Sequence, residues 1–146
     1  MTVAFLGTGL MGLPMAANIA DAGIGVRAWN RTADKARPLA GHGATVAATP
    51  AEAAEGADLL VTVLTDGPTV ADVVTQDVLS ALAGGAVWLQ MSTVGVEYTG
   101  KLAERAAGAG VAYADAPVLG TTGPAKENDV HDVSCSRLPG LRAVTV

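Results

Sequence analysis

Three glycines near the start of the chain have the spacing of a turn that binds phosphate. Gly7, Gly9 and Gly12 fit the pattern G-x-G-x-x-G within the stretch VAFLGTGLMGLPMAANIADAG. In such turns the first glycine permits a tight bend, the second admits a pyrophosphate, and the third lets the next helix pack closely. The free N–H groups and the dipole of that helix attract the anion. We therefore expect a dinucleotide to bind here, with Leu10 and Met11 completing the contact; a ligand-free turn is the alternative.

A second stretch, AWNRT, bears on which dinucleotide is bound. NAD-binding sheets carry Asp or Glu about 20 residues beyond the glycine turn, where it accepts a hydrogen bond from the ribose 2′-OH. Here Asn30 is neutral, and Arg31 could pair with two oxygens of a 2′-phosphate. The sequence thus predicts NADP in preference to NAD, held by Asn30, Arg31 and Thr32. The alternative is that Arg31 is a solvated loop charge beside Thr32 as a helix N-cap.

These residues require a sheet that brings them to one edge. Short apolar runs alternate with Ala-rich helical stretches, which is typical of βαβ units, and continuously apolar strands indicate helices on both faces. We predict an α/β fold with a doubly wound, mostly parallel Rossmann-type sheet. Strands are expected within residues 2–7, 25–30, 43–48, 58–64, 86–91 and 110–117, and helices over 11–22, 33–40, 50–55, 68–82 and 96–109.

The size of the chain suits one domain. Its 146 residues are enough for a single core, and we place a dinucleotide-binding domain at residues 1–125 and an irregular tail at residues 126–146. Residues 78–96 carry no charge, but Gly84 and Gly85 interrupt them. They are therefore interpreted as a helix end, a turn and a buried strand, not as a membrane span.

Charge and cysteine content exclude several classes of partner. The formal net charge of −5 argues against nucleic acid and anionic membranes, which attract basic surfaces. Cys135 is the single cysteine, so it forms no intrachain disulfide, and no signal-like basic and apolar segment opens the chain. We expect a cytoplasmic protein whose partner is a small-molecule substrate.

Four stretches in order resemble the cofactor-binding half of the β-hydroxyacid dehydrogenases. They are FLGTGLMGLPMAANIADAG with WNRT, then VTVLTDGPTV, QMSTV and DAPVLGTTGPA. That family includes 3-hydroxyisobutyrate dehydrogenase and the glyoxylate/succinic semialdehyde reductases, and it is distantly similar to imine reductases and 6-phosphogluconate dehydrogenase. The resemblance implies hydride transfer between NADP(H) and a small hydroxyacid or semialdehyde.

The resemblance also implies roles for residues in the second and third stretches. Leu64, Thr65 and Thr69 would line the cofactor, and Thr65 stands where a proline is common in the family. Thr93 would lie near the nicotinamide, and Ser92 would bind substrate. All five lie at or just beyond the carboxyl ends of predicted strands, at the edge where open α/β sheets bind ligands.

The fourth stretch, residues 115–125, is similar to a substrate-binding D-A-P-V-S-G-G motif. Leu119 replaces the serine and Thr121 the second glycine. The donors to a substrate carboxylate would then be Gly120, Thr121 and Thr122. A turn that closes the domain is the alternative.

The family's catalytic lysine, in a G-x-x-x-K-x-x-x-N pattern on a later helix, has no counterpart. None of Lys35, Lys101 and Lys126 is followed four residues later by Asn. A hydride acceptor needs a nearby proton donor, so we assign no catalytic residue. Neither His42 nor His131 has the spacing of a metal site.

We accordingly expect a fragment or the product of a disrupted reading frame, without the family's C-terminal helical domain. The apolar surface which that domain would cover could drive association. The leading hypothesis is the cofactor domain of an NADP-dependent oxidoreductase with little or no turnover alone. A non-catalytic dinucleotide-binding module, an imine reductase relative and a purely structural domain are the alternatives.

Overall fold

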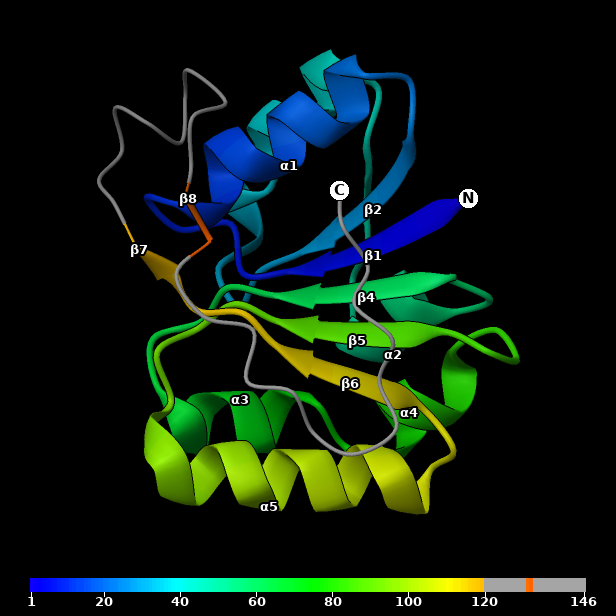
Figure 1. The fold of residues 1–146 in the computed structure, drawn as a ribbon. Coiled ribbons are helices and arrows are strands. Elements are labelled where there is room, and N and C mark those ends of the chain that lie inside the picture. The colour runs from blue at the N-terminus through cyan, green and yellow to red at the C-terminus, as the bar shows by residue number, and fades with distance from the viewer. Residues whose placement is uncertain (120–130, 133–146) are drawn as a thin grey trace.

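A six-stranded parallel sheet forms the centre of the computed structural model, which describes residues 1–119 and 131–132. The strand order is β3-β2-β1-β4-β5-β6 (Figure 1), the order of a doubly wound dinucleotide-binding sheet. The strands are β1 (Thr2–Leu6), β2 (Gly25–Trp29), β3 (Thr45–Val46), β4 (Leu59–Thr62), β5 (Val87–Gln90) and β6 (Ala112–Asp115). Each lies within a predicted segment, and the Rossmann-type fold is confirmed.

Five α-helices and two 3₁₀ helices connect these strands in the described part of the chain. They are α1 (Gly12–Asp21), η1 (Ala33–Lys35), η2 (Arg37–His42), α2 (Pro50–Ala54), α3 (Gly67–Val73), α4 (Gln76–Ala81) and α5 (Gly95–Gly108). Residues 78–96 contain the end of α4, a turn and β5, as predicted. Across the described residues, no helix is long and apolar enough to span a membrane.

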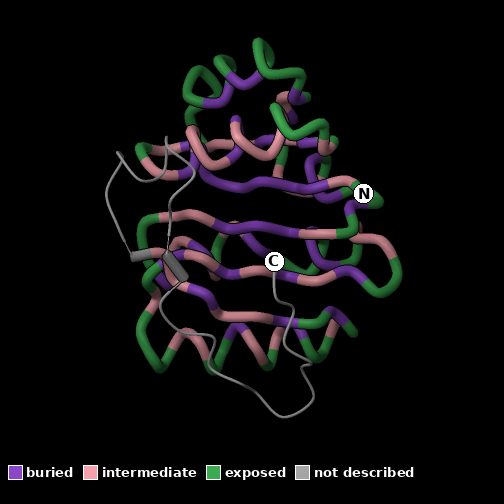
Figure 2. The backbone as a smooth tube through the Cα atoms, turned by 45° about the horizontal axis from the view of Figure 1, so that its top comes forward, coloured by how far each residue is buried: buried purple, intermediate pink, exposed green. Residues whose placement is uncertain are grey.

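The sheet separates two apolar clusters, because successive residues of a strand point to opposite faces. On β1, Val3 and Phe5 pack in the cluster that includes α1 and η2 residues, whereas Ala4 and Leu6 pack with residues of α2, α3, α4 and α5. All four side chains are buried, and Figure 2 shows the central strands as the most buried part of the backbone. The strands of this region are therefore covered on both faces, as the sequence predicts.

One face of the sheet at β5 is less covered by helices than the sequence predicts. Along β5 the burial alternates: Trp88 and Gln90 are buried, but Val87 and Leu89 are only half-buried. Leu89 packs at the margin of the cluster formed with α1. Among the described elements, the helices thus cover one face completely and the other mainly over β1 and β2.

Two predicted helices take a different form. Residues 33–40 form η1 and η2 in place of one α-helix, and Pro38 occupies the start of η2, where its missing N–H and fixed φ are tolerated but an uninterrupted α-helix is not. Residues 68–82 form α3 and α4, separated at Val74 and Thr75. The Arg105 guanidinium donates hydrogen bonds to the carbonyls of Ala71 and Val74 at the end of α3. A contact from α5 therefore stabilises the break.

The C-terminal part is described only in a short antiparallel pair. β7 (Val118–Leu119) pairs with β8 (His131–Asp132), so residues 131–132 form a strand within the segment that we predicted to be irregular. The predicted domain boundary at residue 125 lies outside the described residues.

Candidate functional site at the carboxyl edge of the sheet

The glycine loop between β1 and α1 has one open position and two packed ones. Gly7 adopts φ +103°, which favours glycine, and a Cβ there would overlap the carbonyl oxygen of Val63. A Cβ at Gly12 would overlap the carbonyl oxygen of Gly7, whereas a Cβ at Gly9 would have no other atom within 4 Å. The first and third glycines are therefore required by packing inside the protein. The second leaves the backbone free for the approach of a ligand.

This loop has further groups that fit a bound anion. Gly12 begins α1, so the first N–H groups of a ten-residue helix lie directly after the loop. The hydroxyl of Thr8 is buried and has no hydrogen-bond partner among the described residues. Leu10 is 83% exposed. The loop thus fits the pyrophosphate of a dinucleotide.

Asn30 holds the glycine loop from the end of β2. Its Oδ1 accepts from the N–H of Thr8 at 3.0 Å, and its Nδ2 donates to the carbonyl of Thr32 at 3.1 Å. Next to it, the N–H of Gly7 donates to the carbonyl of Trp29 at 2.9 Å. The side chain of Asn30 therefore fastens the loop to the neighbouring strand. Sequence reasoning missed this role because the partner lies 22 residues away.

Arg31 differs from the other described arginines. Arg37 pairs with Asp34 at 3.0 Å, Arg27 donates to the carbonyl of Glu52, and Arg105 is bound at the end of α3. Arg31 is exposed and makes no hydrogen bond or ion pair within the described residues. Thr32 occupies the N-cap position of η1 but makes no side-chain cap bond. Among the described residues the Arg31 guanidinium therefore has no partner, and Arg31 directly follows Asn30, which contacts the glycine loop.

The loop after β4 lies at the same edge. The N–H of Leu64 donates to Ser92 Oγ at 2.8 Å, and Thr65 is exposed. The N–H of Thr69 donates to Asp66 Oδ1 at 2.8 Å, which caps α3 and lowers the pKa of the Asp66 carboxyl. The three residues that the resemblance assigned to the cofactor thus follow β4, with Thr69 in the first turn of α3.

Ser92 and Thr93 line a cavity of about 390 Å³ at the ends of β5 and β6. Thr93 is exposed, whereas Ser92 is 3% exposed and its hydroxyl already bonds with Leu64. Asp115 and Thr99 line the same cavity; from the sequence, Asp115 was included only as the first residue of the substrate-like stretch, and Thr99 was given no role. Asp115 is the last residue of β6. Its position at the carboxyl end of a strand was the signal that could have identified it as a site residue.

The remaining residues considered in the sequence analysis lie away from this edge or outside the described residues. Gly120, Thr121 and Thr122 lie outside the described residues, as do Lys126 and Cys135. Lys101 pairs with Glu97 on α5 at 2.6 Å, and Lys35 is exposed in η1.

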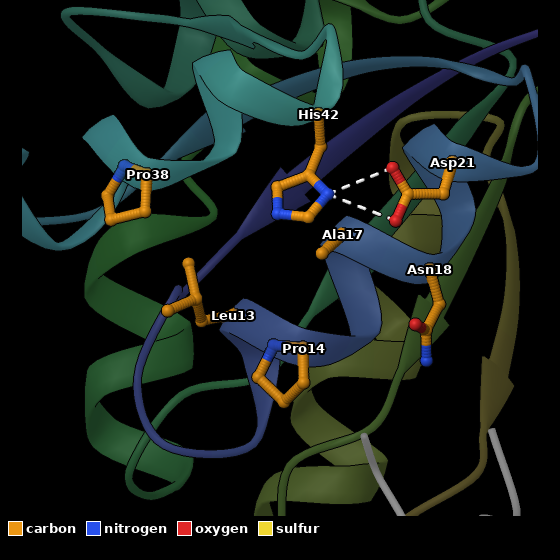
Figure 3. A pocket seen from close by; sticks show the side chains of 7 residues that line it. All are labelled: Leu13, Pro14, Ala17, Asn18, Asp21, Pro38 and His42. Atoms are coloured by element: carbon orange, nitrogen blue, oxygen red, sulfur yellow. Dashed lines mark hydrogen bonds and ion pairs between the residues drawn. The ribbon is translucent and has the colours of Figure 1, made fainter. Parts of the chain in front are cut away.

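A second cavity, of about 280 Å³, lies between α1 and η2 (Figure 3). Its apolar lining comes from Leu13, Ala17 and neighbouring prolines, and His42 Nδ1 lies 2.9 Å from Asp21 Oδ1. None of the predicted cofactor residues lines it. No group of three or more His, Cys, Asp or Glu side chains that could hold a metal occurs in the described parts of the chain.

Comparison with known proteins gives a family match over most of the chain. Residues 2–134 match the NAD binding domain of 6-phosphogluconate dehydrogenase. The match continues beyond residue 125, where we placed the end of the resemblance.

Curated relatives are similar over the same region. Glyoxylate/succinic semialdehyde reductase 1 of Arabidopsis thaliana is 35% identical over 132 residues, which are 89% of this chain and 46% of that protein. An uncharacterized oxidoreductase of Bacillus subtilis is 39% identical over 122 residues, 82% of this chain and 43% of that protein. The chain therefore spans less than half the length of these relatives.

Solved structures share the fold. A Mycobacterium tuberculosis 3-hydroxyisobutyrate dehydrogenase with L-serine superposes with a TM-score of 0.84 at 34% identity, covering 88% of this chain and 44% of that one. An imine reductase from Myxococcus stipitatus in complex with NADP⁺ gives a TM-score of 0.76 at 27% identity, covering 84% and 42%.

Proposed function

Because the chain belongs to the family of the NAD binding domain of 6-phosphogluconate dehydrogenase, we propose that it binds NADP(H) at the carboxyl edge of its sheet. We propose further that it is the cofactor domain of an oxidoreductase acting on a small hydroxyacid or semialdehyde. The named activities of the Arabidopsis and Mycobacterium relatives support this substrate class. When bound, the nicotinamide supplies or accepts the hydride.

Preference for NADP over NAD rests chiefly on Arg31. Its guanidinium is free of partners among the described residues, and Arg31 directly follows Asn30, which contacts the glycine loop with its open middle position. A guanidinium can donate two parallel hydrogen bonds to a 2′-phosphate. Asn30 adds no negative charge that would repel that phosphate. Arg31 thus holds the 2′-phosphate, while the glycine loop and the start of α1 hold the pyrophosphate.

The nicotinamide half of the cofactor occupies the other side of this edge in our proposal. Leu64, Thr65 and Thr69 contact it from the loop after β4, and Thr93 from the loop after β5. The cavity that Ser92 and Thr93 line receives the substrate. Its position at the ends of β5 and β6 agrees with the general location of ligands in open α/β sheets.

A lysine placed as proton donor is missing from the described residues. Lys101 is engaged with Glu97, and no lysine stands in the G-x-x-x-K-x-x-x-N pattern. Hydride transfer to a carbonyl requires a proton at the developing alkoxide. This observation favours a second candidate, a dinucleotide-binding module that is not catalytic by itself.

Replacing Arg31 by alanine tests the cofactor preference. Calorimetric titration of Arg31→Ala should give NADPH binding weakened about tenfold or more, since a charged hydrogen bond is lost, while NADH binding changes little. Arg37→Ala is the matched control, because Arg37 is a neighbouring exposed arginine paired with Asp34. An unchanged ratio of NADPH to NADH affinity in Arg31→Ala would exclude the proposed role.

Turnover separates the two candidate functions on the same purified chain. NADPH oxidation with glyoxylate or succinic semialdehyde supports the enzyme, and binding without oxidation supports the module. If neither NADPH nor NADH binds, both candidates are wrong and the domain is structural.

A further inference from the structure

We propose that Gln90 is a positioning residue that fixes the loops after β4, β5 and β6 for the nicotinamide half of the cofactor. The inference rests on the proposed function, because it assumes that the dinucleotide lies along this edge. It concerns a side chain that is itself buried.

Gln90 ends β5 and is fully buried. Its Oε1 accepts from the N–H of Ser92 at 2.7 Å and from the hydroxyl of Thr62 at 3.3 Å. Its Nε2 donates to the carbonyl of Ser92 at 2.7 Å and to Asp115 Oδ1 at 2.9 Å. Both amide hydrogens and both acceptor positions of the side chain are thus used.

These bonds extend to the loops after β4 and β5 and to the end of β6. Ser92 Oγ accepts from the N–H of Leu64, so the loop after β4 is tied to the loop after β5. Asp115 Oδ2 lies 3.2 Å from the hydroxyl of Thr99, so the end of β6 is tied to α5. At the base, Trp88 Nε1 donates to Thr62 Oγ1 at 3.0 Å. The Gln90 amide joins these groups through its bonds to Ser92, Asp115 and Thr62.

The amide at this position does more than fill space in the core. An apolar side chain of similar volume would occupy the same space, but it would leave the N–H and carbonyl of Ser92 and Asp115 Oδ1 without their Gln90 partners, and an unsatisfied buried polar group is costly. Through these bonds the amide fixes where Ser92 and Leu64 lie relative to Asp115. The glutamine therefore serves the geometry of the loops as well as the packing of the core.

The hydrogen bonds of the Gln90 side chain lie in one half of the site. The adenosine side is held separately, by Asn30 and its bond to Thr8 in the glycine loop. None of the bonds of Gln90 reaches β1 or β2 directly. Disturbing Gln90 should therefore weaken contacts to the nicotinamide half and leave those to the adenosine half intact.

Gln90→Met tests this division, with NADPH and 2′,5′-ADP as probes, since the latter carries only the adenosine half with its 2′-phosphate. We expect NADPH binding to weaken about tenfold, as buried hydrogen bonds to the loops are lost, and 2′,5′-ADP binding to stay within about twofold of the wild-type value. Gln76→Met is the matched control, because Gln76 is exposed on α4; it should change neither affinity.

Two results would overturn the inference while the proposed function stands. One is that Gln90→Met binds NADPH as the wild type does, and the other is that it loses both probes equally. If the wild-type chain binds neither probe, the proposed function fails and this inference fails with it.

Hydrogen exchange of the wild-type chain tests the network where Gln90→Met does not fold. The amides of Leu64 and Ser92 should exchange at least about tenfold more slowly than those of the exposed Thr65 and Thr93, because bonded amides open rarely. Equal exchange rates in the two pairs would mean that the network does not hold the loops, and the inference would be wrong.

Discussion

At the scale of single residues, the amide of Asn30 both accepts and donates a hydrogen bond, whereas a carboxylate can only accept. Its Oδ1 accepts from the glycine loop and its Nδ2 donates to the backbone of Thr32. An aspartate could still accept the first bond but could not donate the second. It would also place a negative charge beside the proposed 2′-phosphate position.

Asn30→Asp should therefore alter cofactor choice more than loop structure. We expect NADPH affinity to fall about tenfold, because like charges meet at short range, and NADH affinity to hold or rise as the carboxylate accepts from the ribose hydroxyl. Titration with both cofactors measures the effect. Asn18→Asp, on α1, controls for added charge. Parallel losses for NADPH and NADH in Asn30→Asp would contradict the argument.

At the scale of elements, the glycine loop and the strands could be predicted because their signals are local. Gly7, Gly9 and Gly12 stand within one turn, and each strand is a short apolar run. The break between α3 and α4 could not be predicted, since Arg105 stabilises it from α5. The bonds of Asn30 to Thr8 and of Gln90 to Thr62 and Asp115 cross between strands and have no local signature. Side-chain hydrogen bonds between segments that are distant in the sequence could therefore not be predicted.

The start of α3 is stabilised by a cap that depends on pH. Asp66 accepts from the N–H of Thr69, and this bond lowers the pKa of its carboxyl. A lowered pKa in the folded state means that the cap adds stability above the carboxyl's ordinary pKa. That stability is lost as the pH falls through the lower, folded-state pKa.

Asp66→Ala should therefore be less stable than the wild type at neutral pH, with the difference shrinking as the solution is made strongly acidic. Urea unfolding at a series of pH values measures it. Asp72→Ala serves as the control, because Asp72 is an exposed carboxylate later in the same helix. A wild-type advantage that does not change with pH would show that the Asp66 charge is not the source of the cap's stability.

At the scale of the whole molecule, the sheet joins the two halves of the proposed site. Asn30 holds the adenosine half, and Gln90 holds the nicotinamide half. β1 and β4 pair directly at the centre, with Val3 opposite Leu59 and Leu6 opposite Thr62. The two apolar clusters lie on opposite faces of these same strands. Unfolding of one half would therefore expose the core of the other, and a single domain of this size generally unfolds in one step.

The two tryptophans allow this coupling to be measured, since Trp29 ends β2 and Trp88 lies buried in β5. In a Trp29→Phe chain the remaining tryptophan reports only on the nicotinamide side. With 2′,5′-ADP at 100 times its Kd, Trp88 fluorescence should report a stabilisation of about 2.7 kcal/mol, the full linkage value for a ligand that binds only the folded chain. NADPH at the same multiple of its own Kd should give an equal shift. If 2′,5′-ADP leaves the Trp88 transition unmoved while it shifts the loss of secondary structure, the two halves unfold separately, and Asn30 and Gln90 fasten independent units.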